Sequence, residues 1–405
     1  MKKTIKTTHT YTIEFLLTII LLFTMYTDMT TQGIYYSKFV IIGITLLICG
    51  IKYKKIYYDK SIYIYFLFLV VVCASGIYGI RNDVFVGNII TLICCLVLLI
   101  IIPLIINTQQ RLDIFMICII LFGFIMSIYS ISLTDFNRLM EGTYYASNVL
   151  LKKIGNRNAV AMLIGFSFNM SVYRLLYKKE YKNIFCLVVM FLAILLTGSR
   201  KGVIFCVIPI SLNLFIIILN TKKIKKKIRY LIMFVFLFIT TYYALFNIDF
   251  LYNNIGWRID SIFKNIFFNE VSLEGSFNVR KTMIKLGLEY FKERPIFGHG
   301  IENFRYLYGW QSGHETYSHN NYIELLVDNG LVGFLLYYLF YISIIIKTNI
   351  NRIKSKIKNE KDYYVFCISL LLCMLIIDWG LISYKWYPNY LMLALALIKT
   401  KSSVK

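Results

Sequence analysis

Apolar residues recur along the chain in runs of about twenty, separated by short polar clusters. A helix needs a run of about that length to cross a bilayer, whereas a barrel strand would be about ten residues long with alternating polarity. Backbone amides in lipid must be paired within their own segment, so we expect helices. The pattern predicts twelve of them, at residues 12–27, 34–51, 61–80, 84–106, 112–132, 157–177, 182–197, 202–220, 229–247, 322–346, 362–383 and 386–399.

The predicted fold class is all-α: a polytopic membrane helix bundle with about twelve transmembrane helices and one large extracytoplasmic loop between helices nine and ten. Residues 1–247 would hold helices one to nine, residues 248–321 the loop, and residues 322–405 the last three helices and a cytoplasmic tail. The composition agrees, because 58% of the 405 residues are hydrophobic and only 16% are charged. The first five helices carry few internal charges and are interpreted as scaffold.

The formal net charge of +23 is explained by topology. Lysine and arginine gather in alternate loops, among them Lys52 to Lys60, Lys222 to Arg229 and Lys347 to Lys361. This positive-inside pattern predicts that both termini lie in the cytoplasm, and an even number of spans agrees. Anionic lipid and topology therefore account for the charge, and no nucleic-acid partner is expected.

The nine cysteines lie in or beside apolar segments, and none lies in the predicted outer loop. Without a CxxC spacing they are interpreted as small hydrophobic residues. The N-terminal sequence MKKTIK followed by an apolar run resembles a signal peptide. No small-residue cleavage site precedes Asp28, so we expect a retained first helix.

The stretch from Arg294 to Gly333 gathers polar groups where the predicted outer loop re-enters the membrane. Three of the four histidines lie in it, His299, His314 and His319, and Asn320 and Asn321 follow the last of them. A chain this apolar has little reason to concentrate titratable rings unless a site is present.

Two earlier turns are also polar. An Asn-rich turn around Arg157 opens the sixth helix, and its amides could hold an anion, although a simple helix cap also explains it. The turn from Thr197 to Gly202 places Arg200 and Lys201 on the outer side, where short loops should be poor in cations. Either these side chains reach lipid headgroups, or Arg200 points into the bundle to receive an anionic ligand.

Within the outer loop, residues 278–294 have an apolar face at helical spacing. Its members are Val279, Met283, Leu286 and Tyr290. The spacing predicts an amphipathic helix on the outer face of the bundle, ended by the Arg294-Pro295 step. Arg280 would lie near the opening of the bundle, although a solvated polar face explains Arg280 and Arg258 equally well.

These features together resemble the O-antigen ligase and O-antigen or capsule polymerase superfamily of bacterial membrane glycosyltransferases. The resemblance covers the stretch from Thr197 to Gly333. It rests on Gly198-Ser199-Arg200 on a short outer turn, a large outer loop, Arg280 at a helix start, and the sequence RPIFGHGIENF. The closest match is His319-Asn320, nine residues, Gly330, two residues and Gly333. His299 departs from the family, in which that position is commonly apolar.

The resemblance implies glycosyl transfer from an undecaprenyl-diphosphate-linked oligosaccharide to a hydroxyl of an acceptor glycan. The reaction would take place on the extracytoplasmic face of the bacterial cytoplasmic membrane, without a cofactor. His319 holds the family's position for proton transfer, which an unperturbed pKa near 6.5 suits. The guanidinium groups of Arg200 and Arg280, with Arg258 as a third candidate, fit a diphosphate leaving group because they stay protonated and bind bidentately.

Further residues complete the predicted site. Asn320, Asn321, Glu324 and Arg157 are predicted to bind substrate. If the chain is helical before His319, Glu315 lies one turn upstream and could orient its ring. No metal is expected, because His314 and His319 would lie on different faces of a helix and the outer side holds no Asp-x-Asp pair.

Several functions stay open. A polymerase would add the growing glycan to another lipid-linked repeat unit, and the Lys-, Ile- and Asn-rich composition favours it, being typical of AT-rich bacteria that make capsule or exopolysaccharide. A ligase would transfer the glycan to lipid A core, protein or a wall polymer, and the spacing around His319 favours that. A lipid-linked glycan transporter should show internal repeats and broken helices. Membrane lipid and other polysaccharide-assembly proteins are the remaining candidate partners.

Overall fold

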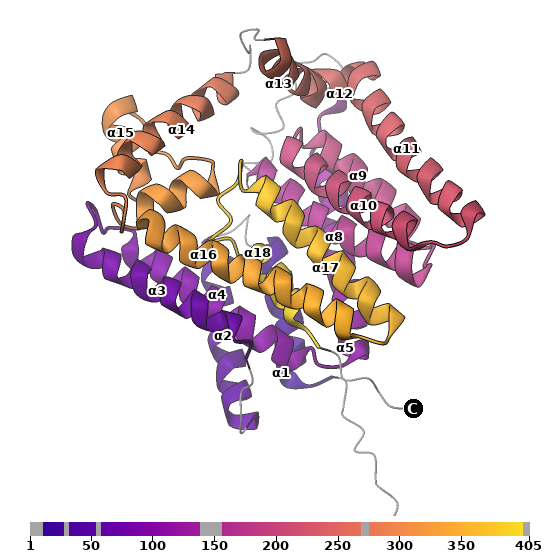
Figure 1. The fold of residues 1–405 in the computed structure, drawn as a ribbon, viewed down its shortest axis with the longest axis horizontal. Coiled ribbons are helices and arrows are strands. Elements are labelled where there is room, and N and C mark those ends of the chain that lie inside the picture. The colour runs from indigo at the N-terminus through magenta and orange to yellow at the C-terminus, as the bar shows by residue number, and fades with distance from the viewer. Residues whose placement is uncertain (1–10, 28–31, 54–57, 138–155, 269–274, 400–405) are drawn as a thin grey trace, which may run out of the picture.

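The computed structural model describes residues 11–27, 32–53, 58–137, 156–268 and 275–399, and this part of the chain is helical without a strand (Figure 1). The predicted all-α class is therefore confirmed. Up to residue 247, the helices of the described residues are α1 (Ile13–Thr27), α2 (Gln32–Lys52), α3 (Ser61–Tyr78), α4 (Phe85–Ile105), α5 (Gln109–Ser132), α8 (Arg157–Lys178), α9 (Asn183–Leu196), α10 (Arg200–Asn220) and α11 (Ile224–Asn247).

The segment predicted as a large loop is itself mostly helical. It contains α12 (Asp249–Leu251), a π-helical turn η1 (Tyr252–Gly256), α13 (Trp257–Phe268), α14 (Gly275–Glu293) and α15 (Phe304–Ser312). The chain then ends in α16 (Asn321–Lys354), α17 (Lys358–Ile377) and α18 (Tyr387–Leu397).

Each of the twelve predicted ranges contains a helix, but not every helix is a clear span. Within the described residues, seven helices are long and apolar enough to cross a membrane: α3, α4, α5, α8, α10, α11 and α16. The apolar helices α1 and α9 are shorter. Many large apolar side chains point outward, such as Ile51 and Ile77, which a lipid environment accommodates and water does not. The chain is a multi-pass membrane protein, and the count of twelve spans stays a prediction.

The bundle is built around α8 and α16. Helix α8 packs against α5, α9 and α10, while α16 packs against α3, α14 and α17. Helix α10 in turn packs against α17 and joins the two groups. By contrast, α11 lies at one side of the bundle and extends away from it (Figure 1). Only 6% of the residues in its most apolar stretch are buried, against 83% for α8.

The helix predicted at residues 278–294 is α14, which ends at Glu293, just before the Arg294-Pro295 step. Of its predicted apolar face, Met283 and Tyr290 are buried while Val279 is 46% exposed. The buried residues form a small core with α15 and the start of α16, made of Met283, Tyr290, Phe304, Leu307, Tyr308, Ile323 and Val327. This core fixes α14 over the beginning of α16.

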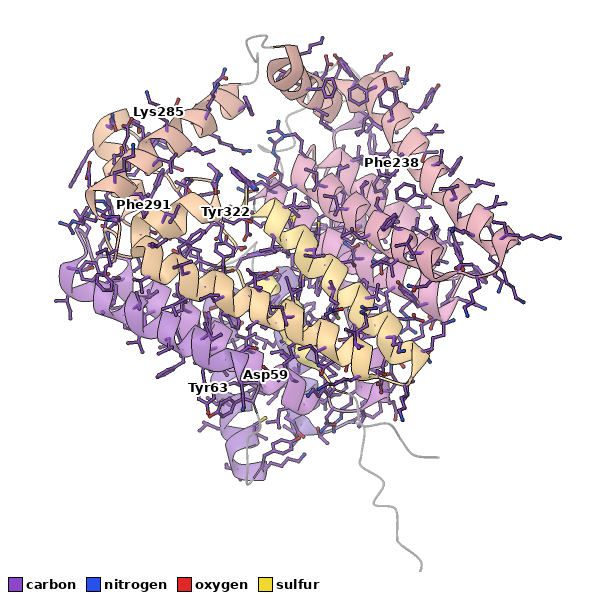
Figure 2. All side chains as sticks on the ribbon, in the orientation of Figure 1. Asp59, Tyr63, Phe238, Lys285, Phe291 and Tyr322 are labelled. Carbon is purple, nitrogen blue, oxygen red and sulfur yellow. The ribbon has the colours of Figure 1, made fainter. Side chains whose placement is uncertain are left out.

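Helix α16 runs away from this end of the bundle, which we call the α14 end. Tyr322 near its start lies close to α14, where Lys285 and Phe291 are labelled, and far from Asp59 (Figure 2). Beyond Gly330, where its backbone is not helical, α16 continues for about 36 Å to Lys354, so its Lys- and Arg-containing last turn lies at the opposite end. The membrane sides of the two ends, and the division into three parts, stay predictions.

Candidate active site

Helix α16 is broken at Gly330, whose φ of 62° and ψ of −168° are not helical. The break receives the glycine-rich segment from Pro295 to Gly300. The amides of His299 and Gly300 donate to the carbonyls of Val327 and Asp328 at 2.8 Å, and those of Leu331 and Val332 donate to Pro295 and Ile296 at 2.8 and 3.1 Å. The segment before α15 therefore pairs with backbone groups that the break in α16 leaves without helical partners.

Two glycines make this approach sterically feasible. Gly298 and Gly330 both have positive φ, which other residues rarely adopt. A Cβ on Gly298 would lie 2.6 Å from the carbonyl oxygen of Asp328, and one on Gly330 would collide with the carbonyl of Ile296. The glycine spacing seen in the sequence thus serves backbone packing, as does Gly333, which lies against the side chain of Asn329.

The carboxylate of Asp328 fastens the same segment. Its two oxygens accept hydrogen bonds from the amides of Glu302 and Phe304, at 2.9 and 2.8 Å. The Glu302 side chain in turn pairs with Lys385 from the loop between α17 and α18. The start of α15 is thereby tied to two other parts of the fold.

His319 sits on a turn that is fastened in a similar way by Glu324. One oxygen of the Glu324 carboxylate accepts from the amide of Ser318 at 2.8 Å. Asn320 caps α16, because its side-chain oxygen accepts from the amides of Tyr322 and Ile323 at 3.0 and 3.2 Å. Ser318 and Asn320 are buried, and His319 between them is only partly buried.

His319 adopts the left-handed conformation, with a φ of 58°. This conformation is strained for a non-glycine residue and persists only where the surroundings enforce it, as the Ser318 and Asn320 hydrogen bonds do here. Strain of this kind concentrates at functional sites. The turn therefore directs one partly exposed imidazole away from two buried neighbours.

The surroundings of His319 keep its ring neutral. Burial, together with the positive charges of Arg280 and Lys201, lowers the pKa of His319 to about 3. Tyr317 packs against the ring, with 4.2 Å between ring centroids. The ring is therefore unprotonated at neutral pH but is a weaker base than the unperturbed pKa near 6.5 expected from the sequence. It becomes a stronger base when an anion offsets those cations.

Two further helices begin beside this turn. Ser199 caps α10 and Asn156 caps α8, and the hydroxyl of Ser199 donates to the side-chain oxygen of Asn158 at 2.8 Å. Arg157 and Arg200 are therefore the first residues of two helices that start together. Helix starts carry partial positive charge, which favours anions. The predicted anion-holding turn of α8 thus adjoins the predicted Arg200 turn.

Lys201 connects these helix starts to His319. It interacts electrostatically with Arg280, Arg200 and Arg157, as well as with His319. The structure therefore brings together four of the predicted site residues, which come from α8, α10, α14 and the turn before α16. Lys201 is the member that the sequence interpretation noted but did not select. Its signal was the second cation on a turn that should be poor in cations.

Of the other predicted substrate-binding residues, Asn321 and Glu324 are buried and hydrogen-bond other groups of the protein. Asn321 is fully buried, and its side-chain oxygen accepts from the amides of Ser383 and Tyr384 at 2.9 and 3.0 Å. Its nitrogen donates to Tyr338 and Asp378. Glu324 is also fully buried. Arg258 belongs to α13, and its side chain lies outside the described part of the structure. Substrate contact by these residues stays a prediction.

The remaining polar residues of the stretch have structural partners. His299 is buried and its Nε2 hydrogen-bonds the carbonyl of Tyr290 at 2.8 Å, while burial lowers the pKa of His299. His314 is exposed. The idea that Glu315 orients His319 is wrong, because residues 314–318 are not helical and Glu315 pairs with Arg81 and Arg305 at 3.2 and 3.6 Å.

Among the described residues, no group of three or more His, Cys, Asp or Glu side chains could hold a metal ion; a metal-free reaction stays a prediction. Two apolar cavities, of about 260 and 200 Å³, lie between helices elsewhere in the bundle and include none of the predicted site residues.

The fold and the site together define a multi-pass, all-helical membrane protein with a histidine beside a cluster of cations at one end of its bundle. Residues 185–338 match the family model described as O-antigen ligase. This match confirms the resemblance to the O-antigen ligase and polymerase superfamily, and it covers every predicted site residue except Arg157. No curated protein matches the chain.

Proposed function

We propose that the protein transfers a glycan from an undecaprenyl-diphosphate-linked donor to an acceptor hydroxyl. His319 takes the proton of the hydroxyl, the oxygen forms a bond with the anomeric carbon of the donor, and the bond from that carbon to the phosphate oxygen breaks. The electron pair stays on the departing diphosphate. Arg200 and Arg280 bind that diphosphate and stabilise the charge that develops on it.

One observation carries this proposal: a neutral imidazole on a strained turn interacts with cations that come from separate helices. A base alone would need no cations, and an anion-binding site alone would need no imidazole held in a left-handed conformation. The match of residues 185–338 to the O-antigen ligase model supports the same class of reaction.

The proposed location is the extracytoplasmic face of the bacterial cytoplasmic membrane, with both termini in the cytoplasm. The support is the charge distribution, because the end of α2, the start of α3 and the turn between α16 and α17, where the sequence is rich in Lys, lie away from the α14 end (Figure 1). Cysteine accessibility labelling at Ser312, an exposed residue of α15, tests this orientation in intact cells. Labelling only after the membrane is permeabilised would contradict it.

Within this reaction class, we propose polymerisation of surface polysaccharide repeat units, such as those of a capsule or exopolysaccharide. A ligase reaction, in which lipid A core, protein or a wall polymer accepts the glycan, is the second candidate, and the description of the matching family model favours it. Reconstitution with defined lipid-linked repeat units separates the two. A ladder of products indicates a polymerase, and a single addition to a different acceptor indicates a ligase.

The transferase proposal itself is tested by His319→Ala in the same reconstituted system. Loss of product with retained folding is expected. A variant that keeps wild-type glycan transfer would overturn the role of His319, and a wild-type protein that moves the lipid-linked donor across the membrane without transferring the glycan would establish the transporter alternative.

A further inference from the structure

Lys201 belongs to the cluster of cations beside His319, but the proposed mechanism gives it no role. It follows Arg200 in the first turn of α10, and its side chain extends to the loop between α17 and α18. There, its Cε lies 3.1 Å from the position that a Cβ would take on Gly380. The missing side chain of Gly380 leaves room for the lysine stem, so the ammonium group is held at the α14 end rather than released into solvent.

The charges found to act on Lys201 all have its own sign. They belong to Arg280, Arg200 and Arg157. Among the described residues, no carboxylate forms an ion pair with Lys201. A partly buried ammonium group surrounded by charges of its own sign is electrostatically unfavourable, and a bound anion would offset the repulsion. The cluster of positive charges around Lys201 is therefore suited to bind a multivalent anion.

We propose that Lys201 is a third cation of the donor site, binding the diphosphate together with Arg200 and Arg280. The identity of the ligand rests on the proposed function. Arginine forks bind two oxygens in one plane, whereas an ammonium group is a compact charge with three rotatable donors. Lys201 can therefore contact a diphosphate oxygen that lies outside the planes of the two guanidinium groups. It acts most strongly when cleavage of the glycosidic bond adds a negative charge to the leaving group.

The same lysine links donor binding to proton transfer. The charges of Lys201 and Arg280 disfavour the protonated form of His319. A diphosphate that offsets these charges raises the proton affinity of the ring. His319 is then a stronger base when the donor is present, so deprotonation of the acceptor follows donor binding.

The test compares full-length wild type with Lys201→Met in nanodiscs, using geranylgeranyl diphosphate as a binding probe. Lys201→Met is expected to raise the Kd by about 10- to 100-fold, which corresponds to the loss of one charged hydrogen bond. Lys281→Met is the matched control, because Lys281 is an exposed lysine one residue from Arg280 on α14. It should change the Kd by less than about two-fold, as expected for a solvated charge.

A second measurement separates a role in binding from a role in folding. With active protein, the acid limb of kcat/KM should move to higher pH in Lys201→Met, because removing a positive charge lets His319 take up a proton more readily. Lys201→Arg keeps the charge and should leave the limb in place. If Lys201→Met does not fold, Lys201→Gln carries the same expectations.

The outcomes distinguish the two proposals. A folded Lys201→Met with an unchanged Kd and an unchanged pH profile overturns the role of Lys201. Wild type that binds the diphosphate but transfers no glycan overturns the proposed function and leaves the donor-site assignment intact. If the variant loses affinity only for anionic phospholipid, in nanodiscs prepared with and without it, Lys201 is a lipid-headgroup contact and the proposal fails.

Discussion

The turns around His299 and His319 both precede α16 in the chain, and a carboxylate from α16 holds each of them, but their imidazoles have different surroundings. Asp328 holds the segment around His299, and Glu324, one helical turn earlier, holds the turn of His319. In the first turn the imidazole is buried against a backbone carbonyl. In the second it remains partly exposed and interacts with Arg280 and Lys201. In both turns a carboxylate anchors backbone amides, and the direction of the imidazole distinguishes the buried His299 from His319, which is proposed to react.

The largest expected difference concerns the two histidines. Replacing His319 by Gln should reduce glycan transfer by about 10²- to 10⁴-fold, the usual contribution of a positioned base, with little change in Tm. His299→Leu should do the reverse, because the Tyr290 carbonyl at the end of α14 loses its partner at a cost of about 1–3 kcal/mol. Transfer assays and thermal unfolding on the same samples check this. Equal loss of activity in both variants without a change in Tm would contradict the assignment of a catalytic role to His319 and a structural role to His299.

The next effect concerns the break in α16. Gly330→Ala should lower the Tm strongly, because a Cβ there combines a positive φ with a collision against Ile296. The strain alone amounts to about 1–3 kcal/mol. Gly313→Ala is the matched control, since Gly313 also has positive φ but has open space around it. If both variants unfold at the same temperature, the close approach at Gly330 is not important for stability.

A smaller effect should separate the two carboxylates. Asp328→Asn replaces one acceptor by a donor that faces an amide, at a cost of about 1–3 kcal/mol. Glu324→Gln should cost less than about 1 kcal/mol, because only one of its oxygens accepts a hydrogen bond among the described residues. Unfolding temperatures of the two purified variants measure the difference. A larger loss in Glu324→Gln would mean that the two turns are not held alike.

A further expected effect is a pH dependence of stability. His319 has a folded-state pKa of about 3, below its unfolded value near 6.5. The unfolded chain therefore binds more protons between these values, and the contribution of this residue to stability is full above about pH 6.5 and is lost as the pH falls. The slope of Tm against pH between 4 and 7 should flatten in His319→Gln. A slope that stays unchanged would show that His319 is not protected from protonation.

The helices were predictable from sequence because the length of an apolar run decides whether a helix forms in lipid. The polar end of the bundle was predictable only in part. His319, Arg280 and Arg200 were selected because they match the motifs of the family that the sequence resembles, and Arg157 because it opens an Asn-rich turn. The structure places the four close to one another.

Other features depend on contacts between distant segments and leave no local pattern. The break at Gly330 exists because residues 295–300 pair with it, and Asn321 is buried because the loop before α18 surrounds its side chain. Lys201 was visible as an extra cation on its turn. Its closeness to His319 depends on how α10 packs beside the start of α16, which hydropathy does not determine.

The distance along the chain between Arg200 and His319 has a consequence for biosynthesis. During translation, α8 and α10 enter the membrane long before the ribosome reaches the turn ahead of α16. A nascent chain that has emerged only as far as α14 would carry its arginines and Lys201 but no base. Under the proposed function, such an intermediate could bind the lipid-linked donor but could not transfer its glycan until the turn of His319 and the start of α16 have been inserted.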